Sequence, residues 1–163
     1  DPDGDWSSDV CSSDLLIETR RRGGQVVFDN NYRPRLWASI EAARAAYHKV
    51  LAEVDIALLT EDDEYALFGY ADSEQVFAAY PAIAEVVLKR GAEDCLIRCA
   101  GQRFAVPALK VETVVDTTAA GDSFSAAYLA SRLKGGSPQE AALAGHRLAS
   151  RVIQVPGALI PRG

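Results

Sequence analysis

Apolar residues along the chain alternate between short runs rich in Val, Ile and Leu and longer stretches with a helical period. The short runs predict strands at residues 25–29, 55–59, 85–89, 95–99, 103–106 and 111–115. The periodic stretches predict helices at residues 38–52, 61–68 and 73–79, with two further helices that begin near Phe124 and Ser137. Residues 16–22 look like the tail of a helix. Strands alternating with helices predict an α/β fold, a mostly parallel central sheet with helices on both faces.

Residues 114–124 have the layout of a strand, a tight turn and a helix. Two valines run into Asp116 as a buried strand would end, and apolar helical spacing starts at Phe124. In this layout the backbone N–H groups from Ala119 to Gly121 lie at the start of the helix and point at one spot, which favours an anion there.

Asp122 stands beside this predicted anion site. A carboxylate in that place suits a general base that takes a proton from a hydroxyl as the hydroxyl attacks a phosphoryl group. The alternative is that Asp122 only complements the helix dipole and Gly121 only turns the chain. Residue types and spacing alone leave both interpretations open.

A polar loop at residues 29–35 follows the predicted strand at 25–29. It holds two arginines, two asparagines and a tyrosine. Guanidinium groups bind carboxylate or phosphate through two parallel hydrogen bonds, so the loop suits an acidic or polyhydroxylated ligand. A solvated loop with no ligand is the alternative.

Composition narrows the classes of function. The net charge is −6 and there is no basic stripe, which argues against nucleic acid as a partner. No apolar run approaches the length that spans a membrane, and no signal peptide is visible. Cys95 and Cys99 lie about 13 Å apart if their segment is a strand, too far for a disulfide. We therefore expect a reduced, cytoplasmic protein.

Residues 1–15 differ from the rest of the chain. They hold five aspartates, four serines and no basic residue, so much of the acidity is local. We interpret them as a non-native tail, with a native disordered tail as the alternative. The domain we expect covers residues 16–163.

The turn and the polar loop both resemble a known family. Residues 116–124 resemble the D-T-x-G-A-G-D-x-F signature of ribokinase-like (pfkB) carbohydrate kinases, with Ala119 in place of the usual glycine. An alanine there is strained if the backbone needs a positive φ. Residues 28–37 resemble the corresponding loop of the 2-keto-3-deoxygluconate kinases within this family.

The resemblance implies a role for several residues. Asp122 matches the general base, and the anion hole matches Ala119, Ala120 and Gly121. Asp63, with Thr60 in place of an asparagine, matches an N-x-x-E motif that organises Mg²⁺ through water; an ordinary acidic helix start is the alternative. The implied substrate-binding residues are Asn31, Arg33 and Asp122. The implied nucleotide-binding residues are Lys89, Gly91, Gly121, Gly145 and His146.

The activity implied is transfer of the γ-phosphoryl group from MgATP to a hydroxyl of 2-keto-3-deoxygluconate. Ribose, fructose or a nucleoside such as adenosine is the alternative substrate, and a nucleotide-binding fragment without catalysis is the alternative function. Family chains are about twice as long, so we expect a carboxy-terminal half that lacks the lid and is inactive alone. The partners expected are a sugar acid and ATP, and a homo-oligomer of the full-length protein stays open.

Overall fold

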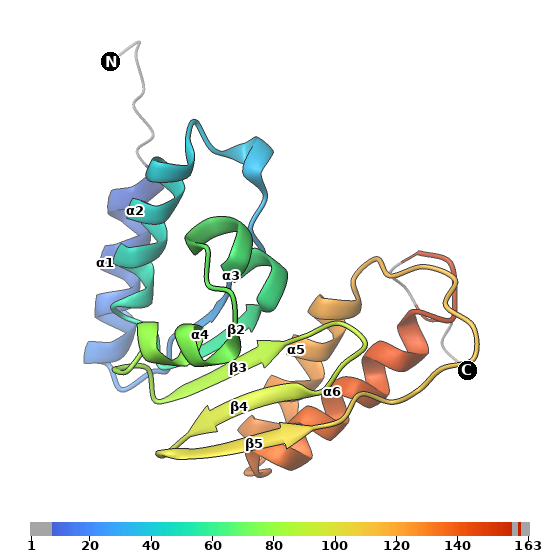
Figure 1. Ribbon diagram of the computed structural model, residues 1–163. Helices are drawn as coiled ribbons and strands as arrows, with labels where there is room; N and C mark the ends of the chain where they lie inside the picture. Colours follow the sequence, from blue (N-terminus) through green and yellow to red (C-terminus); the bar gives the residue numbers. More distant parts are fainter. Residues whose placement is uncertain (1–7, 158–159, 161–163) are drawn as a thin grey trace. The chain divides into compact units, whose positions relative to one another are not determined.

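The computed structural model describes residues 8–157 and residue 160 (Figure 1). Its elements are α1 (Ser8–Arg21), β1 (Val27–Asp29), a 3₁₀ turn η1 (Pro34–Leu36), α2 (Ile40–Leu51), β2 (Ile56–Thr60), α3 (Glu61–Phe68), α4 (Ser73–Ala79), β3 (Glu85–Lys89), β4 (Cys95–Cys99), β5 (Gln102–Val106), α5 (Ala120–Leu133) and α6 (Pro138–Val152). The strand order is β1-β2-β3-β4-β5. The chain divides into two compact units, and the boundary between Val86 and Val87 falls inside β3.

The first unit is built on the parallel pair of β1 and β2, in which Val27 lies opposite Ile56 and Asp29 opposite Leu58. Strand β2 is apolar and buried, as expected of a strand covered on both faces. Tyr47 of α2 is the centre of an aromatic cluster. Its ring meets the rings of four other residues edge-on: Phe28, Tyr32, Trp37 and Phe68.

The second unit contains an antiparallel hairpin and two packed helices (Figure 1). Strands β4 and β5 pair from Cys95 opposite Val106 to Cys99 opposite Gln102. A two-residue turn with positive φ at both Ala100 and Gly101 connects them, as the twist of a tight hairpin requires. Helices α5 and α6 pack along each other, and α6 also contacts both strands.

The predicted bounds of α3, α4, β3 and β4 are those of the structure. Helix α1 begins at Ser8, so the backbone of residues 8–15 is helical and residues 16–21 form the end of this helix, as predicted. Residues 1–7 lie outside the described residues, and the non-native origin of residues 1–15 stays a prediction. None of the helices described here is long and apolar enough to cross a bilayer.

The predicted strand at residues 111–115 is wrong. The structure gives this segment no strand, and Val114 and Val115 are 55% and 51% exposed. The backbone N–H groups of Val115 and Asp116 donate instead to the carbonyl oxygen of Ile153, at 2.8 and 3.2 Å. The segment is therefore tied to the end of α6 and does not join the sheet.

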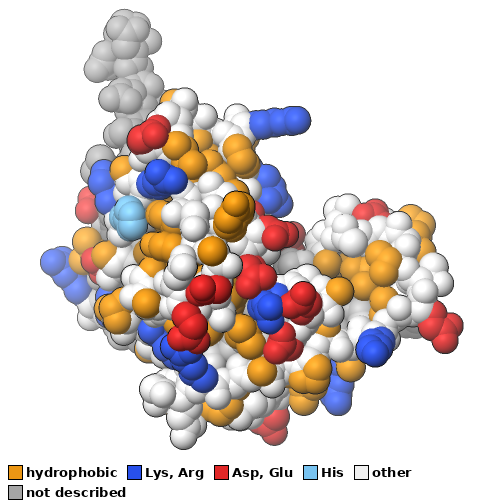
Figure 2. Space-filling view, in the orientation of Figure 1, with side chains coloured by type: hydrophobic (Ala, Val, Ile, Leu, Met, Phe, Trp, Pro, Cys, Tyr) orange, Lys and Arg blue, Asp and Glu red, His pale blue; other side chains and the backbone are white. Residues whose placement is uncertain are grey.

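The structure also shows the distribution of charged side chains on one face and the state of the two cysteines. Figure 2 shows basic and acidic side chains interspersed over the face drawn there. Cys95 and Cys99 are free thiols. Burial raises the pKa of Cys95 to about 12, so this thiol is protonated and unreactive near neutral pH.

Ala119 is the residue through which the chain enters α5. It has φ 59° and ψ 14°, the left-handed conformation that favours glycine. The preceding loop is held by Asp116, whose carboxylate accepts hydrogen bonds from the N–H groups of Thr118 (2.8 Å) and Gly157 (2.9 Å). A hydrogen bond from the Thr118 side chain, together with these two backbone N–H groups, holds the pKa of Asp116 below its usual range. Because Ala119 has this left-handed backbone, the strain expected from an alanine at this position is present.

Replacing Ala119 by glycine should raise the free energy of unfolding by up to about 1 kcal/mol. An L-residue in the left-handed region costs about 1–2 kcal/mol, which the greater freedom of glycine in the unfolded chain partly offsets. Urea denaturation measures the change. The matched control is Ala126→Gly, at an exposed position inside α5, which should lower stability by about 1 kcal/mol. Equal losses in both variants would contradict the strain at Ala119.

Candidate active site

The start of α5 offers backbone donors to solvent. Ala120 donates its N–H to the carbonyl oxygen of Thr117 at 3.1 Å, so this predicted donor closes the turn. Gly121 and Asp122 follow as the second and third residues of the helix, where backbone N–H groups have no carbonyl partner within the helix. Both residues are exposed. The first turn of α5 therefore keeps an anion-binding end with a carboxylate on it.

A buried ammonium lies beneath this turn. Lys89 ends β3 and is 8% exposed, and its Nζ donates to the Oγ of Ser125 at 3.2 Å. The same Nζ would lie 3.9 Å from a Cβ built on Gly121. A positive charge shielded from water adds to the helix dipole, so Lys89 strengthens the attraction for an anion at Gly121.

A cavity of about 510 Å³ opens beside the start of α5. Its lining is mostly apolar, as in sites that take a flat aromatic group. Thr117 and Ala120 border it at the start of α5, and His146 and Ser150 border it on α6. The remaining lining residues are Gly91, Ala92, Ala108, Leu109, Lys110, Val111, Val114, Ala149 and Ile153.

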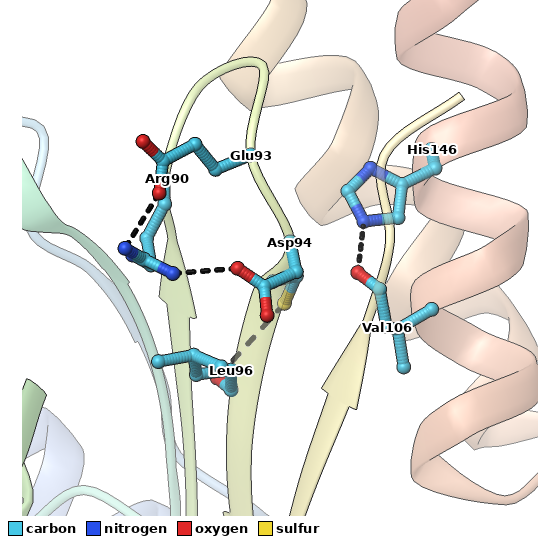
Figure 3. Close-up of polar contacts among 7 residues, drawn as sticks. Arg90, Glu93, Asp94, Leu96, Val106 and His146 are labelled. Carbon is cyan, nitrogen blue, oxygen red and sulfur yellow. Dashed lines mark hydrogen bonds and ion pairs between the residues drawn. The ribbon is translucent and has the colours of Figure 1, made fainter. Parts of the chain in front are cut away.

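His146 is 7% exposed, and its Nε2 lies 3.1 Å from the carbonyl oxygen of Val106 (Figure 3). A carbonyl only accepts, so Nε2 carries the proton. Burial lowers the pKa of His146, which keeps the ring neutral near pH 7. The neighbouring Gly145 does not line the cavity. A Cβ on it would come within 2.6 Å of the ring of Phe124, so Gly145 lets α5 and α6 approach closely.

Gly91 lies in a turn that an ion-pair cluster closes. Arg90 binds Glu93 at 2.6 Å and Asp94 at 2.5 Å (Figure 3). Gly91 has φ 61° in this turn and lines the cavity. Asp94 is therefore held in this turn by its ion pair with Arg90.

Two of the predicted substrate residues, Asn31 and Arg33, lie in the first unit with the predicted magnesium residue Asp63, whereas Asp122 belongs to the second unit. Asp63 accepts a hydrogen bond from the backbone N–H of Tyr32 at 3.1 Å, so the polar loop is fastened to the first turn of α3. Asn31 has φ 32°, and Arg33 is exposed, with its guanidinium donating to the carbonyl oxygen of Tyr32. Tyr32, which lies between Asn31 and Arg33 in the chain, thus connects this loop to Asp63.

Sequence reasoning missed Asn30 and Glu64. Glu64 is fully buried, and its two carboxylate oxygens accept from the hydroxyl of Tyr80 (2.7 Å) and the amide of Asn30 (3.2 Å). Its place one helical turn before the buried Leu67 was the available signal, since residues three apart share a face of a helix. Among the described residues, no group of three or more His, Cys, Asp and Glu side chains is placed to hold a metal ion.

Comparisons with known proteins agree with this architecture. The family model described as "pfkB family carbohydrate kinase" matches residues 8–162. The 2-dehydro-3-deoxygluconokinase of Escherichia coli K12 is 56% identical over 153 residues, which are 91% of this chain and 50% of the relative. The enzyme of the same name from Dickeya dadantii is 55% identical over 152 residues, 90% of this chain and 49% of the relative.

A solved structure confirms the predicted fold class. A putative ribokinase II from E. coli in complex with ATP and Mg²⁺ superposes with a TM-score of 0.78 at 28% identity, over 88% of this chain and 46% of that one. The chain spans about half the length of the curated relatives it matches. Its fold is the ribokinase-like α/β fold in part, and the chain belongs to the pfkB family of carbohydrate kinases.

Proposed function

We propose that this chain is the carboxy-terminal part of a kinase that transfers the γ-phosphoryl group of MgATP to a hydroxyl of 2-keto-3-deoxygluconate. The observation that carries the proposal is the position of Asp122 on the first turn of α5, beside Gly121 and above the buried ammonium of Lys89. Identity of 56% to a kinase named for this substrate supports the choice of sugar. The two free thiols support a cytoplasmic setting.

The residues at the start of α5 divide the work of the reaction. The Asp122 carboxylate takes the proton of the sugar hydroxyl while the hydroxyl oxygen attacks the γ-phosphorus and ADP leaves, a role worth about 10²–10⁴ in rate. The N–H of Gly121 and the charge of Lys89 face the negative charge of the transferring group. The N–H of Gly121 is oriented by the helix before the substrate arrives, so its orientation costs no reorganisation during the reaction.

The apolar cavity suits the adenine of ATP. Its border at Thr117 and Ala120 lies at the anion-binding end of α5, so we assign the phosphates to that end and the base to the side of α6. His146 then closes the base end as a neutral ring held by Val106. Gly91 forms another part of the cavity wall. Its φ is 61°, a backbone conformation that residues with a side chain rarely adopt.

Magnesium fits the residues of the first unit only as a partly hydrated ion. Asp63 offers one carboxylate that could hold a water of the ion, since Mg²⁺ commonly keeps several waters while it binds substrate phosphates. When bound, the ion neutralises charge on the phosphate oxygens. Asp63 would hold one of its waters, and the N–H of Tyr32 orients the carboxylate for this role.

Arg33 is the residue we assign to the acid group of the sugar. It is exposed on the loop after β1, where a guanidinium can bind a carboxylate through two hydrogen bonds. Asn31 precedes it with a left-handed backbone that turns the loop. A neutral sugar such as ribose or fructose gives Arg33 no charged partner.

Activity tests use a completed kinase, defined as this chain from Leu16 onward joined to the amino-terminal half of the E. coli relative. Asp122→Asn should lower its kcat by at least about 100-fold and change the KM for ATP by less than about threefold, because only the proton acceptor is lost. Asp62→Asn, the same change at an exposed position of α3, should leave both constants unaltered. An Asp122→Asn enzyme with normal kcat would refute the assignment.

Arg33→Ala should reduce kcat/KM for 2-keto-3-deoxygluconate by about 10- to 100-fold. The same variant should lose much less on the analogue whose carboxylate is reduced to an alcohol, since the lost guanidinium pairs with the acid. Arg35→Ala, an exposed arginine of the same loop, is the control and should lose little on either compound. Equal losses on acid and alcohol would show that Arg33 serves the phosphates or the fold.

The chain by itself should bind ATP weakly and form no ADP in response to the sugar acid. The cavity and the anion-binding end belong to one compact unit of this chain, whereas catalysis needs both reactants held in place. Calorimetry with ATP and a coupled assay for ADP test the two halves of this expectation. Turnover of the chain at the rate of the completed kinase would contradict it.

A further inference from the structure

Glu64 is a buried carboxylate to which the mechanism gives no role. It is fully buried in the first turn of α3, whereas its neighbour Asp62 is exposed. Burying a charged group is costly unless hydrogen bonds satisfy it, and here the Tyr80 hydroxyl and the Asn30 amide each bond to one oxygen. Burial raises the pKa of Glu64, and the two hydrogen bonds oppose that rise.

Asn30 uses its whole hydrogen-bonding capacity in this network. Its Nδ2 donates to Glu64 Oε1 (3.2 Å) and to the carbonyl oxygen of Thr60 (3.3 Å). Its Oδ1 accepts from the N–H groups of Asn31 (2.9 Å) and Thr60 (3.1 Å). An asparagine has two donor and two acceptor sites, so every site is filled and the amide has a single orientation. Glu64 helps fix that orientation because its Oε1 accepts one of the two N–H bonds of the amide nitrogen.

The backbone of Asn30 is held as firmly as its side chain. Its N–H donates to the carbonyl oxygen of Leu58 in β2, and its own carbonyl accepts the hydroxyl of Tyr47. Asn30 is 2% exposed. It therefore joins the end of β1 to the end of β2 through both backbone and side chain.

The residues beside this junction are those proposed to bind the substrates. Asn31 and Arg33 follow Asn30 on one side, and Asp63 precedes Glu64 on the other. Tyr32, between Asn31 and Arg33, bonds back to Asp63 through its N–H. Asn30 is thus adjacent in the chain to the loop assigned to the sugar acid, and Glu64 is adjacent to Asp63, the carboxylate assigned to magnesium.

We propose that Glu64 is a positioning residue. Through Asn30, it holds the loop of residues 31–33, assigned to the sugar acid, in a fixed position beside Asp63, the carboxylate assigned to magnesium. The proposal rests on the proposed function and adds residues that touch neither substrate. A buried network in which every hydrogen bond is made specifies one geometry. Removal of one acceptor lets the remaining groups of the network rearrange. Loss of Glu64 should therefore loosen the grip on the sugar acid more than the grip on ATP.

The test is made in the completed kinase with Glu64→Met, which removes the acceptor and keeps an unbranched side chain of similar length. It should raise the KM for the sugar acid at least about 10-fold and change the KM for ATP less than about twofold. Glu64→Gln should stay within about threefold of the parent for both, because its carbonyl oxygen still accepts from Asn30. The melting temperature of each variant is measured alongside.

Asn30→Ala separates action through Asn30 from a general loss of packing. It should raise the KM for the sugar acid by a similar factor, and Asn30→Ala/Glu64→Met should be no worse than the worse single variant, since both remove the same link. If Glu64→Met does not fold, Tyr80→Phe removes only one hydroxyl and should shift the same constant in the same direction by about threefold.

Two outcomes would overturn the proposal. One is a variant set in which the KM values of sugar acid and ATP change together, or in which only the melting temperature falls. The other is a double variant whose effect equals the product of the two single effects. A parent enzyme inactive on 2-keto-3-deoxygluconate would instead refute the proposed function, so the two failures are distinguishable.

Discussion

The entry of the chain into α5 is the constraint on which the rest of the site depends. A helix presents its first N–H groups to an anion only if the preceding turn keeps side chains and carbonyls away from them. Here that turn needs a left-handed residue, and an alanine at position 119 supplies it despite the strain. The hydrogen bonds of Asp116 and the tie of Val115 to Ile153 fix the loop before it. The surrounding structure thus holds a conformation that Ala119 would not prefer.

A second junction organises the other compact unit in a comparable way. At the ends of two adjacent parallel strands, Asn30 satisfies backbone groups that the ladder leaves unpaired, and Glu64 locks its amide. Ligands of open α/β sheets bind beyond the carboxyl ends of strands, which is where both residues lie. Each unit therefore supplies one rigid support for exposed functional groups: α5 for Asp122, and the Asn30 junction for Arg33 and Asp63.

The sequence predicted the elements well where periodicity was strong. Helices α3 and α4 and strands β3 and β4 have the predicted bounds because apolar runs and breaks are sharp there. The prediction failed at residues 111–115. A β-branched run indicates an extended backbone, but it does not distinguish pairing in a sheet from hydrogen bonds to the end of a helix. Gly145 shows a related limit. Its place near the nucleotide was expected, whereas its contact with Phe124 depends on how α5 and α6 pack.

The candidate site was predictable for residues that stand in a motif and not for those beneath it. Asp122, Gly121 and Arg33 follow from local patterns and from the resemblance they carry. The pairing of Glu64 with Asn30 depends on a contact between segments about 30 residues apart, which a single sequence does not reveal. The sequence also could not predict that the Nζ of Lys89 lies near Gly121, because this depends on the direction of a buried side chain.

The most direct measurement is a crystal structure of the completed kinase with Mg²⁺ and a non-hydrolysable ATP analogue. The account predicts a γ-phosphate oxygen about 3 Å from the N–H of Gly121, with the Asp122 carboxylate facing it and adenine in the cavity beside His146. Phosphates bound away from the start of α5, or an empty cavity with the nucleotide elsewhere, would contradict the assignment of this chain's residues to phosphoryl transfer.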